Sequence, residues 1–291
     1  MKVIVLSIAV LAIVGVLLID RGPQVDDASY WIDLMRTGDT EIRSQARDAL
    51  VELGAEAVPA LIEACEDADE WIRWEAVNAL GLITLEDPEP ARAAIPALVG
   101  CALRDTNSHP RWRSLWALCA FPSDVEDQEI VPLLEQGASR DDQRIEWNSA
   151  VALAFLDVSS AAGILNDGVD SADEFQQWEA IYCLGMVHDQ DSIGLLSAVV
   201  SNVDGYNTRL RQEAANSLRK TAASEASEAL VLALQDPEAG VRWRAAMALA
   251  ECANADVARS IEEALAKEQD EFARLQMEEA IARLHEPPQP W

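Results

Sequence analysis

The clearest chemical pattern in this chain of 291 residues is a set of tryptophans that recur at a regular spacing. Five of them occupy one repeated position, a second aromatic position follows one helical turn later, and charged residues adjoin several of the rings. The set comprises Trp74, Glu75, Trp112, Arg113, Trp116, Trp147, Trp178, Glu179, Tyr182, Trp243 and Arg244. A stripe of exposed indole rings buries apolar area on a partner, so we predict a binding surface here. The alternative is that each ring packs flat against the next repeat.

Residues for catalysis or metal binding show no comparable pattern. His109, His188 and His285 are expected in turns or in the tail, and no phosphate loop, nucleophile elbow or metal-ligand spacing occurs. Five cysteines at scattered spacings predict neither a disulfide framework nor a zinc site. Cys183 falls where other copies of the repeat have alanine, which indicates a small buried position. We therefore expect no catalytic residue, no metal site, no cofactor and no enzymatic activity, with loose calcium binding by acidic turns as an alternative.

The tryptophans belong to a motif that the chain repeats. Residues 71–80 (WIRWEAVNAL) return as residues 241–249 (VRWRAAMAL), and looser copies bring the total to eight. The copies start at residues 42, 72, 110, 145, 176, 210, 241 and 273, which is a period of 30 to 38 residues. Such a period with helical patterning predicts stacked two-helix repeats. In the second copy Ile72, Ala76, Ala79 and Leu80 form one stripe of the second helix, so they are expected in the core.

Each repeat is expected to contain a helix A followed by a helix B, and B carries the motif. Pro59, Pro96 and Pro132 recur at one place in A helices, where the first helical turn tolerates a missing N–H. An aspartate precedes an arginine by six residues at three turns between A and B: Asp67 and Arg73, Asp105 and Arg111, Asp236 and Arg242. We expect the aspartate to cap helix B and the arginine to reach a carboxylate of the adjacent repeat.

The N-terminus has a different composition. Residues 3–19 are apolar except for Ser7 and Gly15, and about 17 residues are near the lower limit for crossing a bilayer. Small residues at a cleavage spacing are missing, so we predict an uncleaved signal anchor or transmembrane helix in residues 1–20, with the repeats on the extracytoplasmic side of the cell membrane. A cleaved secretory signal and a buried helix of the stack are the alternatives. A linker is expected at 21–28, the repeats at 29–285 and a disordered tail at 286–291.

The formal net charge of -29 restricts the partners. Such a field repels nucleic acid and anionic head groups, so binding to either through a basic patch is not expected. A protein or peptide partner that is basic or neutral is favoured. Acidity of this kind also occurs as an adaptation to salt.

The motif resembles the HEAT repeats, in particular the short repeats named after phycobilisome lyases. The matching residues are 57–61 (AVPAL) in helix A and the motif of helix B, and the likeness extends over about 28–284. Glu146 and Gln177 stand where the pattern has arginine. The resemblance implies an all-α, right-handed superhelix in which the tryptophan positions line the inner, concave face.

Together these features predict a membrane-tethered, non-enzymatic scaffold that holds a protein or peptide in a groove lined by tryptophan and acidic residues. The resemblance also implies an alternative, a bilin lyase-like enzyme whose rings stack on a tetrapyrrole. A carbohydrate-binding module is a third reading, because spaced tryptophans can serve as platforms for sugar rings.

Overall fold

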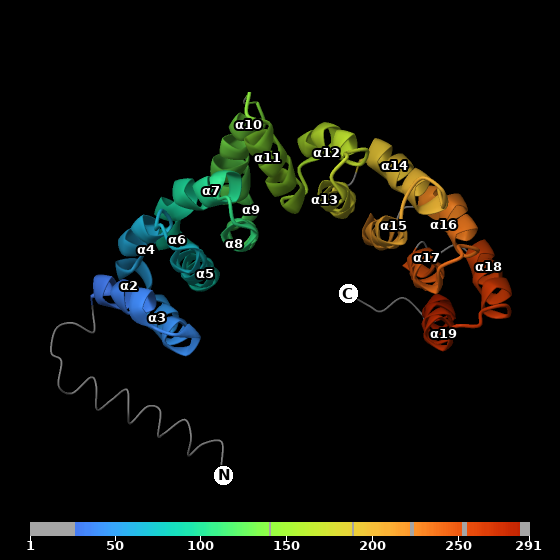
Figure 1. Ribbon diagram of the computed structural model, residues 1–291, viewed down its shortest axis with the longest axis horizontal. Coiled ribbons are helices and arrows are strands. Elements are labelled where there is room, and N and C mark those ends of the chain that lie inside the picture. The colour runs from blue at the N-terminus through green and yellow to red at the C-terminus, as the bar shows by residue number, and fades with distance from the viewer. Residues whose placement is uncertain (1–26, 140, 188, 222–223, 252–254, 286–291) are drawn as a thin grey trace, which may run out of the picture. The chain divides into compact units, whose positions relative to one another are not determined.

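The structure is a computed structural model that describes residues 27–139, 141–187, 189–221, 224–251 and 255–285. Regular structure in these residues is entirely helical, and they form no β-strand. The chain divides into two compact units, Met1–Gln136 (unit 1) and Gly137–Trp291 (unit 2). Within each unit the helices form two layers, A helices in one and B helices in the other (Figure 1). The predicted all-helical fold of A and B pairs is confirmed.

Unit 1 has three such pairs among its described residues: α2 (Ala28–Thr37) with α3 (Thr40–Leu53), α4 (Val58–Ala64) with α5 (Glu70–Glu86), and α7 (Ile95–Arg104) with α8 (Ser108–Leu118). The connecting elements are η1 (Gly54–Glu56), α6 (Pro88–Ala91), η2 (Arg92–Ala94), α9 (Ser123–Val125) and the π-helix η3 (Glu126–Ile130), and α10 (Val131–Ala138) follows them. The B helix α5 packs between α3 and α8. It therefore forms the centre of this unit.

The first helix that lies wholly in unit 2 is the B helix α11 (Gln143–Phe155), because α10 crosses the boundary between the units. Four pairs follow it: α12 (Ala162–Gly168) with α13 (Glu174–Leu184), α14 (Gln190–Ser201) with α15 (Thr208–Thr221), α16 (Ser227–Ala233) with α17 (Ala239–Glu251), and α18 (Ala255–Leu265) with α19 (Glu271–His285). The short 3-10 turns are η4 (Ser159–Ala161) and η5 (Ser224–Ala226). The B helices of this unit pack in chain order, each on the next. Across both units, each predicted copy of the motif starts inside a B helix.

The helix starts follow from local chemistry. Pro59, Pro96 and Pro132 are each the second residue of an A helix, as predicted. The backbone N–H groups of the first helical turn have no partner within the helix, so the missing N–H of proline costs no hydrogen bond there. Helix α5 ends at Glu86 because Asp87 precedes a proline and takes an extended conformation, with φ −148° and ψ 105°.

The core lies between the two layers and between neighbouring B helices. Ile72, Ala76, Ala79 and Leu80 are fully buried, which confirms the predicted stripe. Cys183 is also fully buried in its alanine position. Asn78, by contrast, does not belong to that stripe and is nevertheless only 4% exposed. The reason is that α5 has B helices on both sides, so burial extends beyond one stripe of its surface.

The predicted signal anchor, linker and tail lie at least in part outside the described residues. Residues 1–20 and 286–291 fall there completely, as does most of 21–28. Within the part of the chain that the structure describes, no helix combines the length and the apolarity that crossing a bilayer requires.

Candidate functional site

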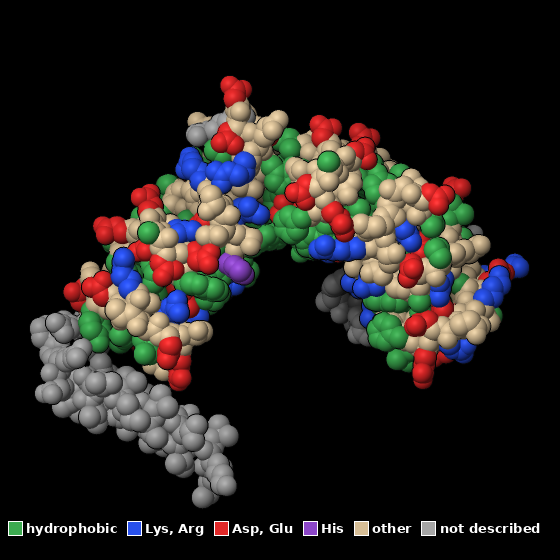
Figure 2. All heavy atoms as spheres, viewed as in Figure 1, with side chains coloured by type: hydrophobic (Ala, Val, Ile, Leu, Met, Phe, Trp, Pro, Cys, Tyr) green, Lys and Arg blue, Asp and Glu red, His purple; other side chains and the backbone are tan. Residues whose placement is uncertain are grey.

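The most exposed aromatic surface of unit 1 lies at the start of the B helices α5 and α8. Trp71 is the second residue of α5 and is 44% exposed. Its ring stacks on His109 of α8, with centroids 5.7 Å apart and planes at 28°, and meets Trp74 edge-on at 6.2 Å. In Figure 2 the purple histidine side chain adjoins a green hydrophobic patch. We name the three residues Trp71, Trp74 and His109 the unit 1 aromatic cluster.

A similar cluster lies on the B helix α13 in unit 2. Phe175, the second residue of α13, is 46% exposed, and its ring lies 6.0 Å from that of Trp178. Trp178 stacks on Tyr182 one turn later, with centroids 5.4 Å apart and planes at 21°. We name Phe175, Trp178 and Tyr182 the unit 2 aromatic cluster. Farther along unit 2, Phe272 of α19 is exposed and meets Trp243 of α17 edge-on at 5.7 Å.

The exposed rings share one position that the sequence analysis did not use. Trp71, His109, Phe175 and Phe272 are each the second residue of a B helix, three residues before the predicted tryptophan position, which is the fifth. Residues three apart share a helix face, so the two positions form one surface. Aligning the copies one residue earlier would have revealed this signal in the sequence.

Three of the four first turns that carry these rings are acidic, and the exception is that of α8, which carries His109. Asp69 and Glu70 precede Trp71, Asp173 and Glu174 precede Phe175, and Asp270 and Glu271 precede Phe272. Each aspartate caps its helix by accepting backbone N–H groups. The glutamate is left beside the exposed ring, so each site pairs an aromatic face with a carboxylate.

The predicted tryptophans are half-buried in the structure, and two of them are held by carboxylates of the next repeat. Trp147 Nε1 donates to Glu179 Oε2 at 2.6 Å, and Trp178 Nε1 donates to Glu213 Oε2 at 3.1 Å. The Trp147 ring also lies so close to Gly168 of α12 that an added Cβ there would be 2.4 Å from it. These rings therefore join neighbouring repeats as well as contributing surface. Trp74, Trp112 and Trp243 are half-buried too.

The predicted residues Arg113 and Trp116 also join repeats. The Trp116 ring packs on Gly81 of the preceding B helix, where an added Cβ would be 2.5 Å from it. The Arg113 guanidinium lies over the same ring, 3.8 Å from its centroid, and its Nε donates to Asn78 at 2.9 Å. The indole is therefore covered by its own repeat and by the preceding one.

Two predicted carboxylates lie inside the stack. Glu75 and Glu179 are 4% and 3% exposed, which differs from the surface position expected beside the rings. Burial raises the pKa of Glu75, and Arg47, at 3.4 Å, partly opposes that shift. Glu75 and Glu179 contact Arg47 and Trp147 of the preceding repeats. The exposed carboxylates beside the rings come instead from the acidic first turns described above.

Cations of the chain itself cover part of the aromatic surface in unit 2. Lys220 Nζ lies 3.9 Å from the centroid of Tyr182, and the guanidinium of Arg209 lies 5.3 Å from that of Trp178. Arg244, a predicted site residue, lies 4.1 Å over Trp243. The surface is therefore of mixed charge, and its rings are suited to cations.

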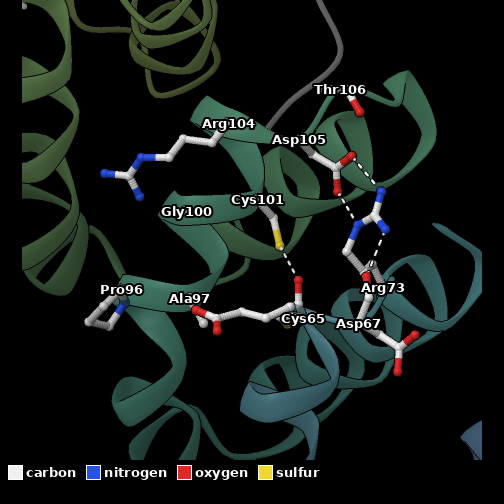
Figure 3. A pocket seen from close by; sticks show the side chains of 11 residues that line it. Cys65, Asp67, Arg73, Pro96, Ala97, Gly100, Cys101, Arg104, Asp105 and Thr106 are labelled. Atoms are coloured by element: carbon white, nitrogen blue, oxygen red, sulfur yellow. Dashed lines mark hydrogen bonds and ion pairs between the residues drawn. The ribbon is translucent and has the colours of Figure 1, made fainter. Parts of the chain in front are cut away.

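Arginines and acids link the turns between A and B helices of neighbouring repeats. Arg73 donates from Nε and Nη2 to the two oxygens of Asp105, at 2.7 and 2.9 Å, and from Nη1 to the carbonyl of Asp67 at 2.8 Å (Figure 3). The same arrangement joins Arg242 to Glu268. For Arg73 and Arg242 the prediction that the arginine reaches a carboxylate of the adjacent repeat is confirmed, and for Arg111 it stays a prediction.

The capping role predicted for the aspartates is wrong. Asp67, Asp105 and Asp236 each accept the backbone N–H two residues later, inside the turn. They lie too far before helix B to reach its first turn, and Asp69 caps α5 instead. Within the described residues, no group of three histidine, cysteine or acidic side chains is placed to hold a metal ion.

A family model of HEAT repeats matches residues 28–119 and 198–282. The chain belongs to the HEAT-repeat family. The family expected from the sequence motif is thus confirmed, while the handedness of the superhelix and a concave position for the tryptophans stay predictions. A comparison with curated proteins gives no match for this HEAT-repeat chain.

Solved structures with a similar fold are distant in sequence. Kap95p, from a complex with RanGDP, has a TM-score of 0.63 at 11% identity, over 88% of this chain and 41% of Kap95p. YibA of Escherichia coli has a TM-score of 0.55 at 17% identity, over 90% of this chain and 94% of YibA. A chain of the CpcE–CpcF phycocyanin lyase complex of Nostoc has a TM-score of 0.45 at 19% identity, over 89% and 94% of the two chains. At these identities the likeness concerns the fold alone.

Proposed function

We propose that this HEAT-repeat protein is a membrane-tethered, non-enzymatic scaffold that binds a protein or peptide through the starts of its B helices. The observation that carries the proposal is the exposure of Trp71 and Phe175 beside half-buried rings of the same helices. Partly exposed aromatic side chains in a supported cluster are the residues that dominate protein–protein affinity. The fold neighbour Kap95p is a protein-binding HEAT protein, in complexes with RanGDP and with Nup1.

A basic segment fits this surface better than a neutral one. Trp71, Phe175 and Phe272 each follow two acidic residues, and the chain has 51 acidic against 22 basic residues. A lysine or arginine of the partner would place its charge between an indole or phenyl face and a glutamate, which combines cation–π attraction with an ion pair. The net charge would also accelerate the encounter, and added salt would slow it.

A peptide array tests the binding surface directly. Arrayed 15-residue peptides rich in lysine and arginine, neutral, or rich in glutamate are probed with the full-length protein and with two pairs of variants. Trp71→Ala and Phe175→Ala each remove one exposed ring. Leu85→Ala and Leu232→Ala remove exposed leucines of α5 and α16 that lie outside both clusters and serve as controls.

Basic peptides should bind, and the aromatic variants should lose at least about tenfold in affinity because a buried hot-spot residue contributes more than about 1.4 kcal/mol. The leucine variants should bind like the wild type. Equal binding by all four variants, or preference for acidic peptides, would refute the proposed surface. A gain of visible absorbance with bilin, or binding to a glycan array that depends on the same rings, would replace it by one of the other two functions.

The tether rests on the apolar composition of residues 3–19. Full-length protein should stay in the membrane pellet after extraction with alkaline carbonate, and a variant that begins at residue 21 should be released. A mature N-terminus near residue 20 in the wild type would show cleavage and secretion instead.

A further inference from the structure

Two cysteines of neighbouring repeats lie close to each other in unit 1. Cys65 follows the last residue of α4, and Cys101 lies in α7. Cys101 Sγ donates a hydrogen bond to the carbonyl oxygen of Cys65 at 3.5 Å, and Figure 3 shows its sulfur directed toward that residue. A hydrogen bond with the Cys101 side chain, together with burial, raises the pKa of the Cys65 thiol well above its ordinary value. The Cys101 thiol therefore contacts Cys65 at its main-chain carbonyl oxygen.

The pair lines an open cavity rather than a sealed core. Both cysteines, with Pro96 and Gly100 of α7, line a cavity of about 430 Å³. Their exposed fractions are only 4% and 6%, so the thiols are shielded from large reagents while a small molecule in the cavity can approach them. The Arg73–Asp105 ion pair lines the same cavity, which places the thiols beside the link between the two repeats.

We propose that Cys65 and Cys101 form a reversible dithiol–disulfide pair that joins α4 to α7, with a small disulfide such as glutathione disulfide as oxidant. One cysteine, as its thiolate, attacks a sulfur of the oxidant, forms a mixed disulfide and releases one glutathione thiolate. The thiolate of the other cysteine then attacks the protein sulfur of that mixed disulfide, forms the Cys65–Cys101 bond and releases the second glutathione. Two electrons pass from the pair to the oxidant, and the two thiol protons leave with the two glutathione molecules.

The geometry favours closure within one chain over bonds between molecules. The Cys101 thiol already lies 3.5 Å from the carbonyl oxygen of Cys65, so the two side chains belong to residues in contact within one chain, whereas a second protein molecule cannot enter the cavity. High thiol pKa values slow the attack at neutral pH, because only the thiolate reacts, so oxidation should accelerate as pH rises. Both cysteines are free thiols in this structure.

Trypsin makes the bond easy to detect. Cleavage after Arg47, Arg73, Arg92 and Arg104 releases Cys65 in residues 48–73 and Cys101 in residues 93–104. Purified full-length protein is equilibrated in buffers of increasing ratio of oxidised to reduced glutathione, quenched with acid, alkylated under denaturing conditions and digested. Mass spectrometry then measures the linked peptide pair and the alkylated single peptides. Cys65→Ala and Cys101→Ala remove the pair, and Cys183→Ala, at a position where other repeats have alanine, is the matched control.

The linked pair should rise from absent to the major species as the ratio increases, disappear on addition of dithiothreitol, and form equally in the Cys183→Ala variant. Circular dichroism of each variant reports whether it folds, so a folding defect cannot be mistaken for a loss of the bond. Two alkylated single peptides at every ratio, or a bond from either cysteine to Cys119, would overturn the proposal.

Discussion

The ion pair between Arg211 and Asp236 provides the sharpest test of how the repeats of unit 2 are held together. Arg211 of α15 donates from Nε to Asp236 Oδ2 at 2.7 Å and from Nη2 to Oδ1 at 3.1 Å. The two residues are 3% and 4% exposed. The third nitrogen of the guanidinium, Nη1, donates to the carbonyl oxygens of Tyr206 and Val203. The carboxylate is therefore the only charge partner that the arginine has within this hydrogen-bonded set.

Asp236→Ala should destabilise unit 2 strongly. It leaves a guanidinium buried without its carboxylate, and breaking such a pair costs about 3–5 kcal/mol. The substitution also removes the acceptor of the Glu238 N–H, which lies 2.8 Å from Asp236 Oδ1. The control is Glu263→Ala, which breaks the Arg259–Glu263 pair at 2.9 Å whose side chains are 85% and 60% exposed. Exposed pairs of this spacing contribute about 0.5 kcal/mol or less.

Urea unfolding followed by circular dichroism, together with hydrogen exchange of peptides from α15 and α17, measures the effect. Asp236→Ala should lower the unfolding midpoint and accelerate exchange in those helices, with little change in α3 of unit 1. Replacing both partners, as Arg211→Met with Asp236→Leu, should recover much of the loss because no charge is left buried. Equal midpoints for the Asp236 and Glu263 variants would refute the reasoning.

Three further predictions concern single contacts. The hydrogen bond from Arg242 lowers the pKa of Glu268 to about 2, which is below the value in the unfolded chain. The ionised carboxylate therefore stabilises the fold fully above pH ~4.5. This contribution, at most about 3 kcal/mol, is lost as the pH falls toward 2. Glu268→Gln should flatten this acid limb in a plot of urea midpoint against pH, and an unchanged limb would contradict the assignment. Gly81→Ala should lower the free energy of unfolding, measured by thermal unfolding, by about 1–2 kcal/mol, because overpacking against Trp116 outweighs the gain in helix propensity. In the double variant with Trp116→Leu this loss should be smaller. If the losses of the two single variants simply add, the contact is contradicted. Trp147→Phe removes the hydrogen bond from the indole N–H to the Glu179 carboxylate, so the free energy of unfolding should fall by about 1.5–3 kcal/mol. A melting temperature equal to that of the wild type would show that the hydrogen bond does not stabilise the fold.

The fold could be predicted because its signals are local and repeated. The motif that begins at Ile72 recurs at starts that all fall inside B helices, and Pro59, Pro96 and Pro132 mark A-helix starts as expected. Burial of small side chains such as Ala79 lets neighbouring B helices approach each other. All eight copies of the motif, although individually weak, indicate the same two-helix repeat, so a misplaced boundary in one copy does not change the predicted fold.

The candidate site was harder to predict because it depends on neighbours that the motif does not specify. Glu75 and Trp74 are adjacent in sequence, yet one is buried and the other half-exposed. Periodicity identifies which face of a helix meets the core, but not how far the next helix extends over that face. Asp67 was misassigned for a related reason, since its distance from the helix start depends on the length of the turn.

The contrast between Trp71 and Trp147 shows why one tryptophan of a B helix stays exposed while another is covered. Trp147 meets a glycine and a buried carboxylate in neighbouring helices, so its ring and its N–H are both satisfied within the stack. Trp71 lies one turn nearer the helix start, where its ring stacks on His109 of the adjacent B helix and the side chain stays 44% exposed. The same side chain therefore stabilises the scaffold where the neighbouring repeat provides space and an acceptor. For Trp147 these features are supplied by Gly168 and Glu179 rather than by the tryptophan itself.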